Sequence, residues 1–149
     1  MNGSAFALHP VADADAEALA DLRVAAMRPS LEAVGRFDEA RARRRLLDGF
    51  DAHCTRAIVA GGERVGFVVV RPAGDDLLLD HLYLAPSAQR AGLGSAVLRR
   101  VIDEARAAGR ALRVGALKDS PANAFYAKHG FRLAATSEWD NHYLLPPAT

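Results

Sequence analysis

The spacing of apolar residues in the first third of the chain predicts one short strand and two helices. Asp13 is expected to be the N-cap of the first helix, because aspartate accepts hydrogen bonds from the first turn. Pro29 is expected to end that helix, since proline has no backbone N–H to donate. The predicted elements are a strand over residues 6–8 and helices over residues 14–27 and 38–47.

Alternation of apolar and polar residues replaces the helical period after residue 54 and predicts a β-meander. Gly61 and Gly62 are typical of a tight hairpin turn, and Gly74 with Asp75 indicates the next turn. Pro86 would end the third strand because it cannot donate to a sheet ladder. The expected strands are residues 57–59, 64–70 and 77–84.

The last third of the chain predicts two helices and three strands. Gly109 and Gly130 are typical of the residue that follows a helix, while Ser120 and Pro121 would cap and open a short helix. The expected elements are a helix over residues 93–105, a strand over residues 111–117, a short helix ending near residue 129, and strands over residues 131–136 and 142–145. The order of these elements predicts an α+β fold with strand, helix and strand at its centre.

The composition is that of one ordinary folded domain. The chain has 149 residues, of which 50% are hydrophobic and 25% are charged, so we expect residues 1–149 to form a single domain. The net charge of +1 argues against nucleic acid as a partner. A nucleic-acid interface on the second helix stays open as an alternative to a solvated helix face. This basic cluster consists of Arg41, Arg43, Arg44 and Arg45.

The sequence gives no sign of a disulfide, a metal site or a membrane segment. Cys54 is the single cysteine, and no Cys or His lies at metal-ligand spacing from it. We interpret Cys54 as an incidental thiol and not as a nucleophile. The apolar runs are far shorter than the roughly 20 residues of a membrane helix, and residues 1–11 lack the pattern of an export signal. We therefore expect a cytoplasmic protein that binds no metal ion.

The most informative segment runs from Gln89 to Ser95 and reads Gln-Arg-Ala-Gly-Leu-Gly-Ser. It lies between a predicted strand and a predicted helix, whose first turn presents unpaired N–H groups. Gly92 and Gly94 have no side chain that would hold an anion away, and Arg90 adds a positive charge. The P-loop and dinucleotide-binding signatures are absent. The segment is expected to hold a phosphate or pyrophosphate group, although glycines at such a turn can also serve the turn alone.

A second signal lies on the short helix between Asn123 and Phe131. Asn123 and Tyr126 are three residues apart, so the two side chains share one helix face. An amide and a phenol can therefore point into one cleft. Taken alone, Tyr126 is also typical of a tyrosine at the edge of a core.

Together and in this order, the two segments resemble the GNAT superfamily of acyl-CoA-dependent N-acyltransferases. The stretch from Leu82 to Ser95 is similar to the family's fourth strand, pyrophosphate loop and following helix, and it contains the pattern Q/R-x-x-G-x-G/A. The stretch from Asn123 to Phe131 is similar to the family's N-x-x-x-Y-x-x-x-G-F segment, except that Tyr126 comes three positions after Asn123, where the family pattern has four. The resemblance implies one GNAT-like α+β domain, with a central, mixed, mostly antiparallel twisted sheet flanked by about four helices.

The resemblance also implies acetyl-CoA, or another acyl-CoA, as the cofactor. Backbone groups of Leu82 and Leu84 would hold the pantetheine arm in the manner of an added strand. Asn123 would reach the pantetheine, and Lys128 would approach the phosphorylated end of the cofactor, although a lysine there also suits the helix dipole. The implied cofactor-binding residues are Leu82, Tyr83, Leu84, Gln89, Arg90, Ala91, Gly92, Leu93, Gly94, Ser95, Asn123, Tyr126 and Lys128.

Acyl transfer to an amine needs a proton acceptor and a proton donor. An alkyl ammonium like that of lysine has a pKa of about 10.4, so a base or a water relay must help to remove its proton. The position of the base in the resembling family corresponds to Asp80, and His81, on the other face of the same strand, is the alternative. Tyr126 would donate a proton to the departing thiolate, and a backbone N–H would stabilise the oxyanion.

The acceptor amine is expected to bind near negative or titratable groups of the first two helices and the chain end. These candidates, which are also ordinary surface residue types, are Glu32, Glu138, Asp140 and His142. The expected function is N-acetylation of a small-molecule or peptide amine. The alternative is an acyl-CoA-binding sensor or interaction domain without turnover. A homodimer formed through the last strand is also compatible with the sequence.

Overall fold

The computed structural model describes residues 5–89 and 92–148, and these residues form an α+β fold. Every helix and strand that the sequence predicts is present. The helices are α1 (Ala16–Ala33), α2 (Glu39–Leu47), α3 (Leu93–Ala107) and α4 (Ala122–Lys128). The strands are β1 (Ala7–Pro10), β2 (Thr55–Ala60), β3 (Glu63–Ala73), β4 (Asp76–Leu84), β5 (Leu112–Leu117), β6 (Arg132–Thr136) and β7 (Asp140–Leu145).

The strands form one mixed sheet in the order β1-β2-β3-β4-β5-β7-β6. β4 and β5 pair in parallel, whereas the pairs β1–β2, β2–β3, β5–β7 and β6–β7 are antiparallel. α3 joins β4 to β5 because two parallel strands need a crossover connection and cannot share a tight turn. The prediction of a mixed, mostly antiparallel sheet with four helices is confirmed.

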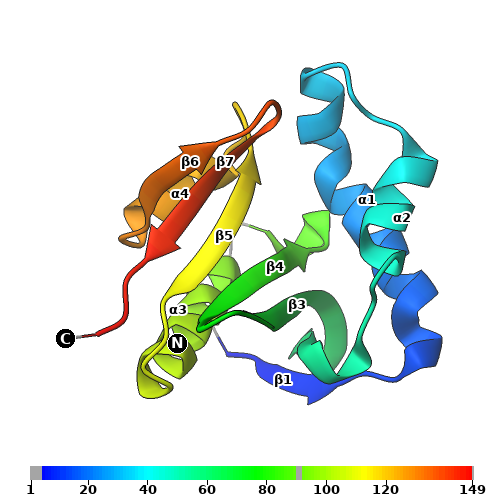
Figure 1. The fold of residues 1–149 in the computed structure, drawn as a ribbon. Helices are drawn as coiled ribbons and strands as arrows, with labels where there is room; N and C mark the ends of the chain where they lie inside the picture. Colours follow the sequence, from blue (N-terminus) through cyan, green and yellow to red (C-terminus); the bar gives the residue numbers. More distant parts are fainter. Residues whose placement is uncertain (1–4, 90–91, 149) are drawn as a thin grey trace. The chain divides into compact units, whose positions relative to one another are not determined.

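By its contacts the chain divides into two compact units. The first contains the residues up to Val69 together with His81–Val97, and the second contains the other described residues. In the first unit, α1 and α2 lie side by side (Figure 1). Its core cluster consists of Leu19, Ala20, Leu46, Phe67 and Val69. In the second unit, β5, β7 and β6 are neighbouring strands (Figure 1).

The first helix does not end at Pro29, as the sequence predicts, but continues to Ala33 with Pro29 inside it. Proline removes the hydrogen bond to the carbonyl four residues earlier, which belongs to Ala25. Both Pro29 and Ala25 are exposed, so water can hydrogen-bond to that carbonyl. The prediction was wrong because proline on the solvent face costs a helix less than it does on a buried face.

Aspartates begin α2 and the turn that precedes α1. Asp38 caps α2 by accepting a hydrogen bond from Arg41 N at 3.0 Å, and this bond lowers the pKa of the Asp38 carboxyl because it favours the charged form. Asp13 is not the N-cap that the sequence predicts, because it starts a 3-10 turn that precedes the helix. The carboxylate of Asp15, at the end of this turn, accepts a hydrogen bond from Ala12 N at 2.8 Å.

Candidate functional site

The end of β4 lies unusually close to β3. A Cβ atom at Gly66 would lie 2.3 Å from the carbonyl oxygen of Tyr83 and 2.8 Å from a side-chain carbon of Leu84. Only glycine allows this approach, because real Cβ atoms do not come so near a backbone atom. Just beyond β4, Ala85 N donates a hydrogen bond to Val65 O at 2.7 Å. The stretch that the sequence assigns to cofactor binding is therefore fixed on its β3 side.

Within the second unit, the first part of β4 pairs in parallel with β5. The pairs run from Leu77 with Leu112 to Leu79 with Val114, while β4 itself continues to Leu84. Backbone N–H and C=O groups at the end of a strand can bind an extended ligand. This geometry suits the expected role of the Leu82 and Leu84 backbone.

The loop after β4 leads directly into the N-terminus of α3. Gly92 has a φ of +74° and open space where a Cβ would stand, and its carbonyl accepts from Ala96 N at 3.1 Å. Gly94 and Ser95 lie in the first turn of α3, where N–H groups have no partner within the helix. Leu93 is buried and anchors this turn. These features fit an anion such as a pyrophosphate.

The sequence also predicts that Gln89, Arg90 and Ala91 of this loop bind the cofactor. Arg90 and Ala91 lie outside the described residues. The side chain of Gln89 turns back onto the strand, where Nε2 donates to Leu84 O at 3.1 Å. Gln89 therefore also fixes the end of β4.

His81 lies in the first unit, with only 3% of its surface exposed. Its ring packs against Phe67 and Tyr83, at centroid distances of 6.2 and 5.6 Å. Nε2 of His81 lies 3.2 Å from Nη1 of Arg45, which comes from α2. Because an arginine nitrogen can only donate, this contact favours the tautomer in which His81 Nε2 accepts.

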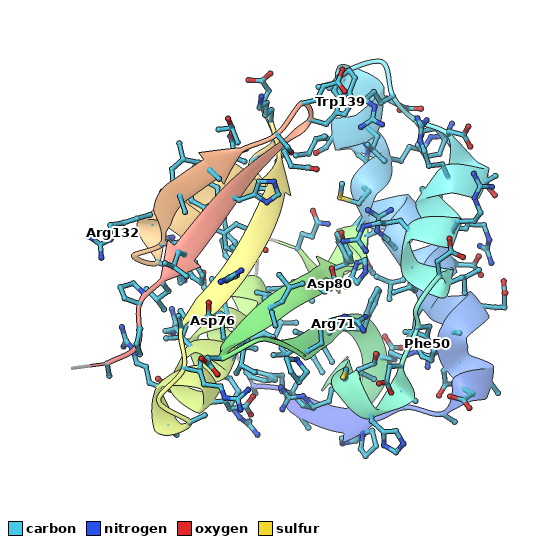
Figure 2. The ribbon with its side chains drawn as sticks, viewed as in Figure 1. Phe50, Arg71, Asp76, Asp80, Arg132 and Trp139 are labelled. Atoms are coloured by element: carbon cyan, nitrogen blue, oxygen red, sulfur yellow. The ribbon has the colours of Figure 1, made fainter. Side chains whose placement is uncertain are left out.

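Asp80 lies in the second unit and forms an ion pair with Arg71 of β3 (Figure 2). Arg71 Nε donates to Asp80 Oδ2 at 3.0 Å, and the Asp80 side chain is 13% exposed. This ion pair fixes the orientation of the Asp80 carboxylate.

Asn123 holds α4 to the neighbouring strands through both ends of its amide. Nδ2 donates to Leu117 O and to Ser120 O, each at 2.9 Å. Oδ1 accepts from Asn141 Nδ2 at 2.9 Å and from Tyr143 OH at 2.8 Å. An amide offers two donor hydrogens and two lone pairs, so these bonds use its full capacity. Asn123 can reach a pantetheine arm only if one of them breaks.

Tyr126 lies on the same face of α4 as Asn123, as the sequence predicts, because both contact Tyr143. The Tyr126 ring is 6% exposed and lies 5.3 Å from Phe125, 5.5 Å from Phe131 and 6.4 Å from Tyr143, measured between centroids. This packing fixes the direction of the phenol. Lys128, two residues later, is exposed at the end of α4.

The residues expected near the acceptor are spread over both units. Glu32 forms an exposed ion pair with Arg28 at 2.9 Å. Glu138 is exposed in the turn before β7, and His142 Nε2 lies 3.1 Å from Ser137 Oγ. Asp140 begins β7.

Arginines of the basic cluster on α2 form ion pairs and hydrogen bonds within the first unit. Arg43 pairs with both Glu17 and Asp21 of α1, and these carboxylates raise the pKa of Arg43. Arg41 Nη2 donates to Arg36 O at 2.8 Å. These contacts favour a structural role for the cluster.

Sequence reasoning missed Arg23, the buried arginine of α1. It is 8% exposed and packs against Tyr83 of β4. The available signal was its position four residues after Leu19, which places a charged residue on the apolar face of the helix.

Residues 52–133 match the family model of the acetyltransferase (GNAT) domain. The match spans more than half of the chain, and the chain therefore belongs to the GNAT acetyltransferase family. It is an acyltransferase by family, and acetyl-CoA is the cofactor of that family. A search of the curated proteins finds no match.

Solved structures of the same fold include several acetyltransferases. The PaiA N-acetyltransferase of Thermoplasma acidophilum, in complex with coenzyme A, is 14% identical with a TM-score of 0.78, over 95% of this chain and 99% of that chain. An acetyltransferase of Thermus thermophilus is 22% identical with a TM-score of 0.75, over 98% and 99%. The ribosomal-protein-S18-alanine N-acetyltransferase of Escherichia coli is 19% identical with a TM-score of 0.72, over 97% and 96%. These similarities confirm the GNAT fold.

The described part of the chain contains neither a helix that could span a membrane nor a cluster of metal-ligating side chains. None of its helices is both long enough and apolar enough to span a membrane. Its His, Cys, Asp and Glu residues form no group of three or more that could hold a metal ion.

Proposed function

We propose that this protein transfers the acetyl group of acetyl-CoA to a primary amine by direct attack. The observation that carries the proposal is the arrangement of β4, the Gly92 loop and the first turn of α3 in a chain of the GNAT family. The acceptor is a small molecule or a peptide. No covalent acyl-enzyme is needed.

The cofactor supplies an activated thioester carbonyl, and the chain supplies the groups that hold it. Backbone groups of Leu82 and Leu84 bind the pantetheine arm. The N–H groups of Leu93, Gly94 and Ser95 bind the pyrophosphate, favoured by the positive end of the α3 dipole. Asn123 orients α4 and does not contact the cofactor, because its hydrogen bonds are all used within the chain.

Asp80 accepts the proton of the attacking amine, directly or through a water molecule. Its ion pair with Arg71 fixes the orientation of the carboxylate. His81 remains the alternative base, and its burial among aromatic rings makes direct contact with an amine harder. Glu138 and His142 are the residues of the second unit that we assign to the acceptor amine, and Glu32 is the one of the first.

Tyr126 donates a proton to the departing thiolate. The aromatic packing of its ring supports this role, since a general acid must be held in one direction. A backbone N–H of β4 stabilises the oxyanion that forms during attack.

Calorimetric titration of the purified chain with acetyl-CoA tests the proposal before any acceptor is known. We expect 1:1 binding in the micromolar range, which corresponds to about 8 kcal/mol, with weaker binding of CoA and none of ATP. Absence of binding to both acetyl-CoA and CoA would contradict the proposal.

An assay of CoA thiol release separates an enzyme from an acyl-CoA sensor. The ion pair that holds Asp80 is the observation that favours a sensor, because it occupies the carboxylate that we assign as the base. A sensor binds acetyl-CoA but releases no CoA thiol with a broad panel of amines. Release with any amine, lost in Asp80→Asn or Tyr126→Phe, identifies an enzyme.

A further inference from the structure

Arg23 is a buried cation in the middle of α1. Its Nη1 donates a hydrogen bond to Ala42 O of α2 at 2.9 Å. Its guanidinium carbon lies 5.5 Å from the centre of the Tyr83 ring on β4. These contacts hold the plane of the guanidinium between two helices and the strand.

The opposite edge of the same guanidinium is not used. Nε of Arg23 is buried and has no hydrogen-bond partner in the described part of the chain. Nη2 shares this edge with Nε. Nε–H and Nη2–H point in parallel and match the two oxygens of a carboxylate.

The ion pairs found among the described residues include none with Arg23. A guanidinium stays charged at all relevant pH values, and burial of a charge without a counter-charge is costly. The aromatic face of Tyr83 recovers part of this cost. A bound anion would recover the rest, because it supplies both the charge and the acceptor that Nε lacks.

The surroundings of Arg23 favour an anion as well. His81 and Tyr83 are two residues apart on β4 and share one face of the strand. Arg45 approaches His81 from α2, while Arg23 approaches Tyr83 from α1. Two arginines therefore lie against the same face of the stretch whose backbone we assign to the cofactor.

We infer that the acceptor is an amine that also carries a carboxylate, and that Arg23 binds this carboxylate through Nε and Nη2. The inference rests on the proposed acetyl transfer. It narrows the acceptor from amines in general to amino acids or peptides with a free carboxylate close to the amine.

Matched pairs of amines that differ only in the carboxylate test the inference. The pairs are phenylalanine with phenethylamine, lysine with cadaverine, and arginine with agmatine, and the readout is CoA thiol release from acetyl-CoA. We expect the acid of at least one pair to react with a kcat/KM about tenfold or more above that of its partner, as for a charged hydrogen-bonded contact. The pair of phosphoethanolamine and ethanolamine tests whether the site binds a phosphate instead. A preference for the anionic amine that is confined to this pair would overturn the carboxylate assignment.

Variants show whether Arg23 makes the distinction. Arg23→Gln removes the charge, while Arg23→Lys keeps a cation near Tyr83 but lacks the paired donors. Both variants should lower the ratio between the kcat/KM of the acid and that of its partner amine to about two or less. The change should come mainly from the KM of the acid, and the kcat/KM of the partner amine should change little. Arg100→Gln, which removes an exposed arginine of α3, should leave the ratio unchanged. An acid preference that persists in a folded Arg23→Lys protein would overturn the inference.

A binding measurement decides the inference even where no amine is acetylated. The wild-type chain is titrated with N-acetylphenylalanine and with N-acetylphenylalanine amide, in the presence of CoA and in its absence. Binding of the acid alone, lost in Arg23→Lys, supports the carboxylate site whatever the outcome of the transfer assay. Equal binding of acid and amide, or no binding of either, overturns it. Failure of acetyl-CoA binding contradicts only the proposed function.

Discussion

At the level of single residues, the packing of Tyr126 allows the role of its hydroxyl to be tested separately from the role of its ring. Its ring is held by Phe125, Phe131 and Tyr143, and phenylalanine fills the same space without the hydroxyl. We therefore expect Tyr126→Phe to fold normally and to bind acetyl-CoA within about twofold of the wild type, with kcat lowered about 10²–10⁴-fold as for loss of a general acid.

Steady-state thiol release and calorimetric titration check the two parts of this prediction. Phe125→Leu is the matched control, because it alters the same aromatic group and leaves the Tyr126 hydroxyl in place. Unchanged kcat in Tyr126→Phe, with an acceptor that the wild type acetylates, would remove Tyr126 from the mechanism.

His129 makes stability depend on pH near neutrality. Burial lowers its pKa from the ordinary value of 6.5, and the positive charges of Lys128 and Arg99 lower it further. The unfolded chain therefore takes up this proton before the folded chain does as the pH falls. The contribution to stability is constant above about pH 7, decreases as the pH falls through 6.5, and levels off below the folded-state pKa.

Denaturant unfolding of the wild type and of His129→Gln at pH 5.0, 6.0, 7.0 and 8.0 measures this contribution. The difference in unfolding free energy between the two proteins should be largest at pH 8.0 and smaller at pH 5.0. A difference that grows toward low pH would mean that the folded chain favours the protonated ring.

At the level of elements, α4 is a helix of seven residues that cannot be stable alone. Asn123 compensates by joining it to the carbonyl of Leu117 and to Asn141 and Tyr143 of β7. The direction of Tyr126, one turn later, depends on the same anchorage. Asn123 is therefore a positioning residue for the acid.

We expect Asn123→Ala to lower the unfolding free energy by about 1–3 kcal/mol, because partly buried polar groups lose their partners. Tyr143→Phe breaks one of these bonds and should cost about 1 kcal/mol. Acetyl-CoA affinity should change less than kcat in both variants. A loss of affinity larger than the loss of kcat, with stability retained, would instead place Asn123 in contact with the cofactor.

The sequence predicted elements well and their exact contacts poorly, for physical reasons. Periodicity and glycine positions report which residues face a core, so all helices and strands were found. Exposure of Pro29 depends on which face of α1 meets solvent, and the hydrogen bonds of Asn123 come from β7, which is distant in the sequence. Such long-range partners leave no local trace in the sequence. The partners of Arg23 on α2 and β4 are also distant in the sequence, and only its place on the apolar face of α1 was a local signal.

The candidate site also combines features that the local sequence predicts with features that depend on distant residues. The prediction of a phosphate-binding loop from Gln89 to Ser95 needs only local order, because strand, glycines and helix are consecutive and the helix dipole follows from that order. The pairing of Asp80 with Arg71 could not be predicted, since it depends on the register of β3 against β4 (Figure 2). The base is therefore the least determined part of the proposed mechanism.

For the molecule as a whole, the two compact units share continuous elements. The boundary between them falls inside β3, β4 and α3, so neither unit can unfold without breaking a strand ladder or a helix of the other. We therefore expect one cooperative transition for residues 1–149, with equal calorimetric and van't Hoff enthalpies.

Acetyl-CoA at about 100 times its Kd should stabilise this folded state by about 2.7 kcal/mol and raise the Tm by roughly 5–10 °C for a chain of this size. Scanning calorimetry with and without the cofactor measures both effects, and ATP at the same concentration is the control. Because acetyl-CoA would contact β4 and α3, the elements that the units share, the whole transition should shift together. Two resolved transitions, with only one moved by acetyl-CoA, would show that the units unfold independently and that the cofactor binds to one of them alone.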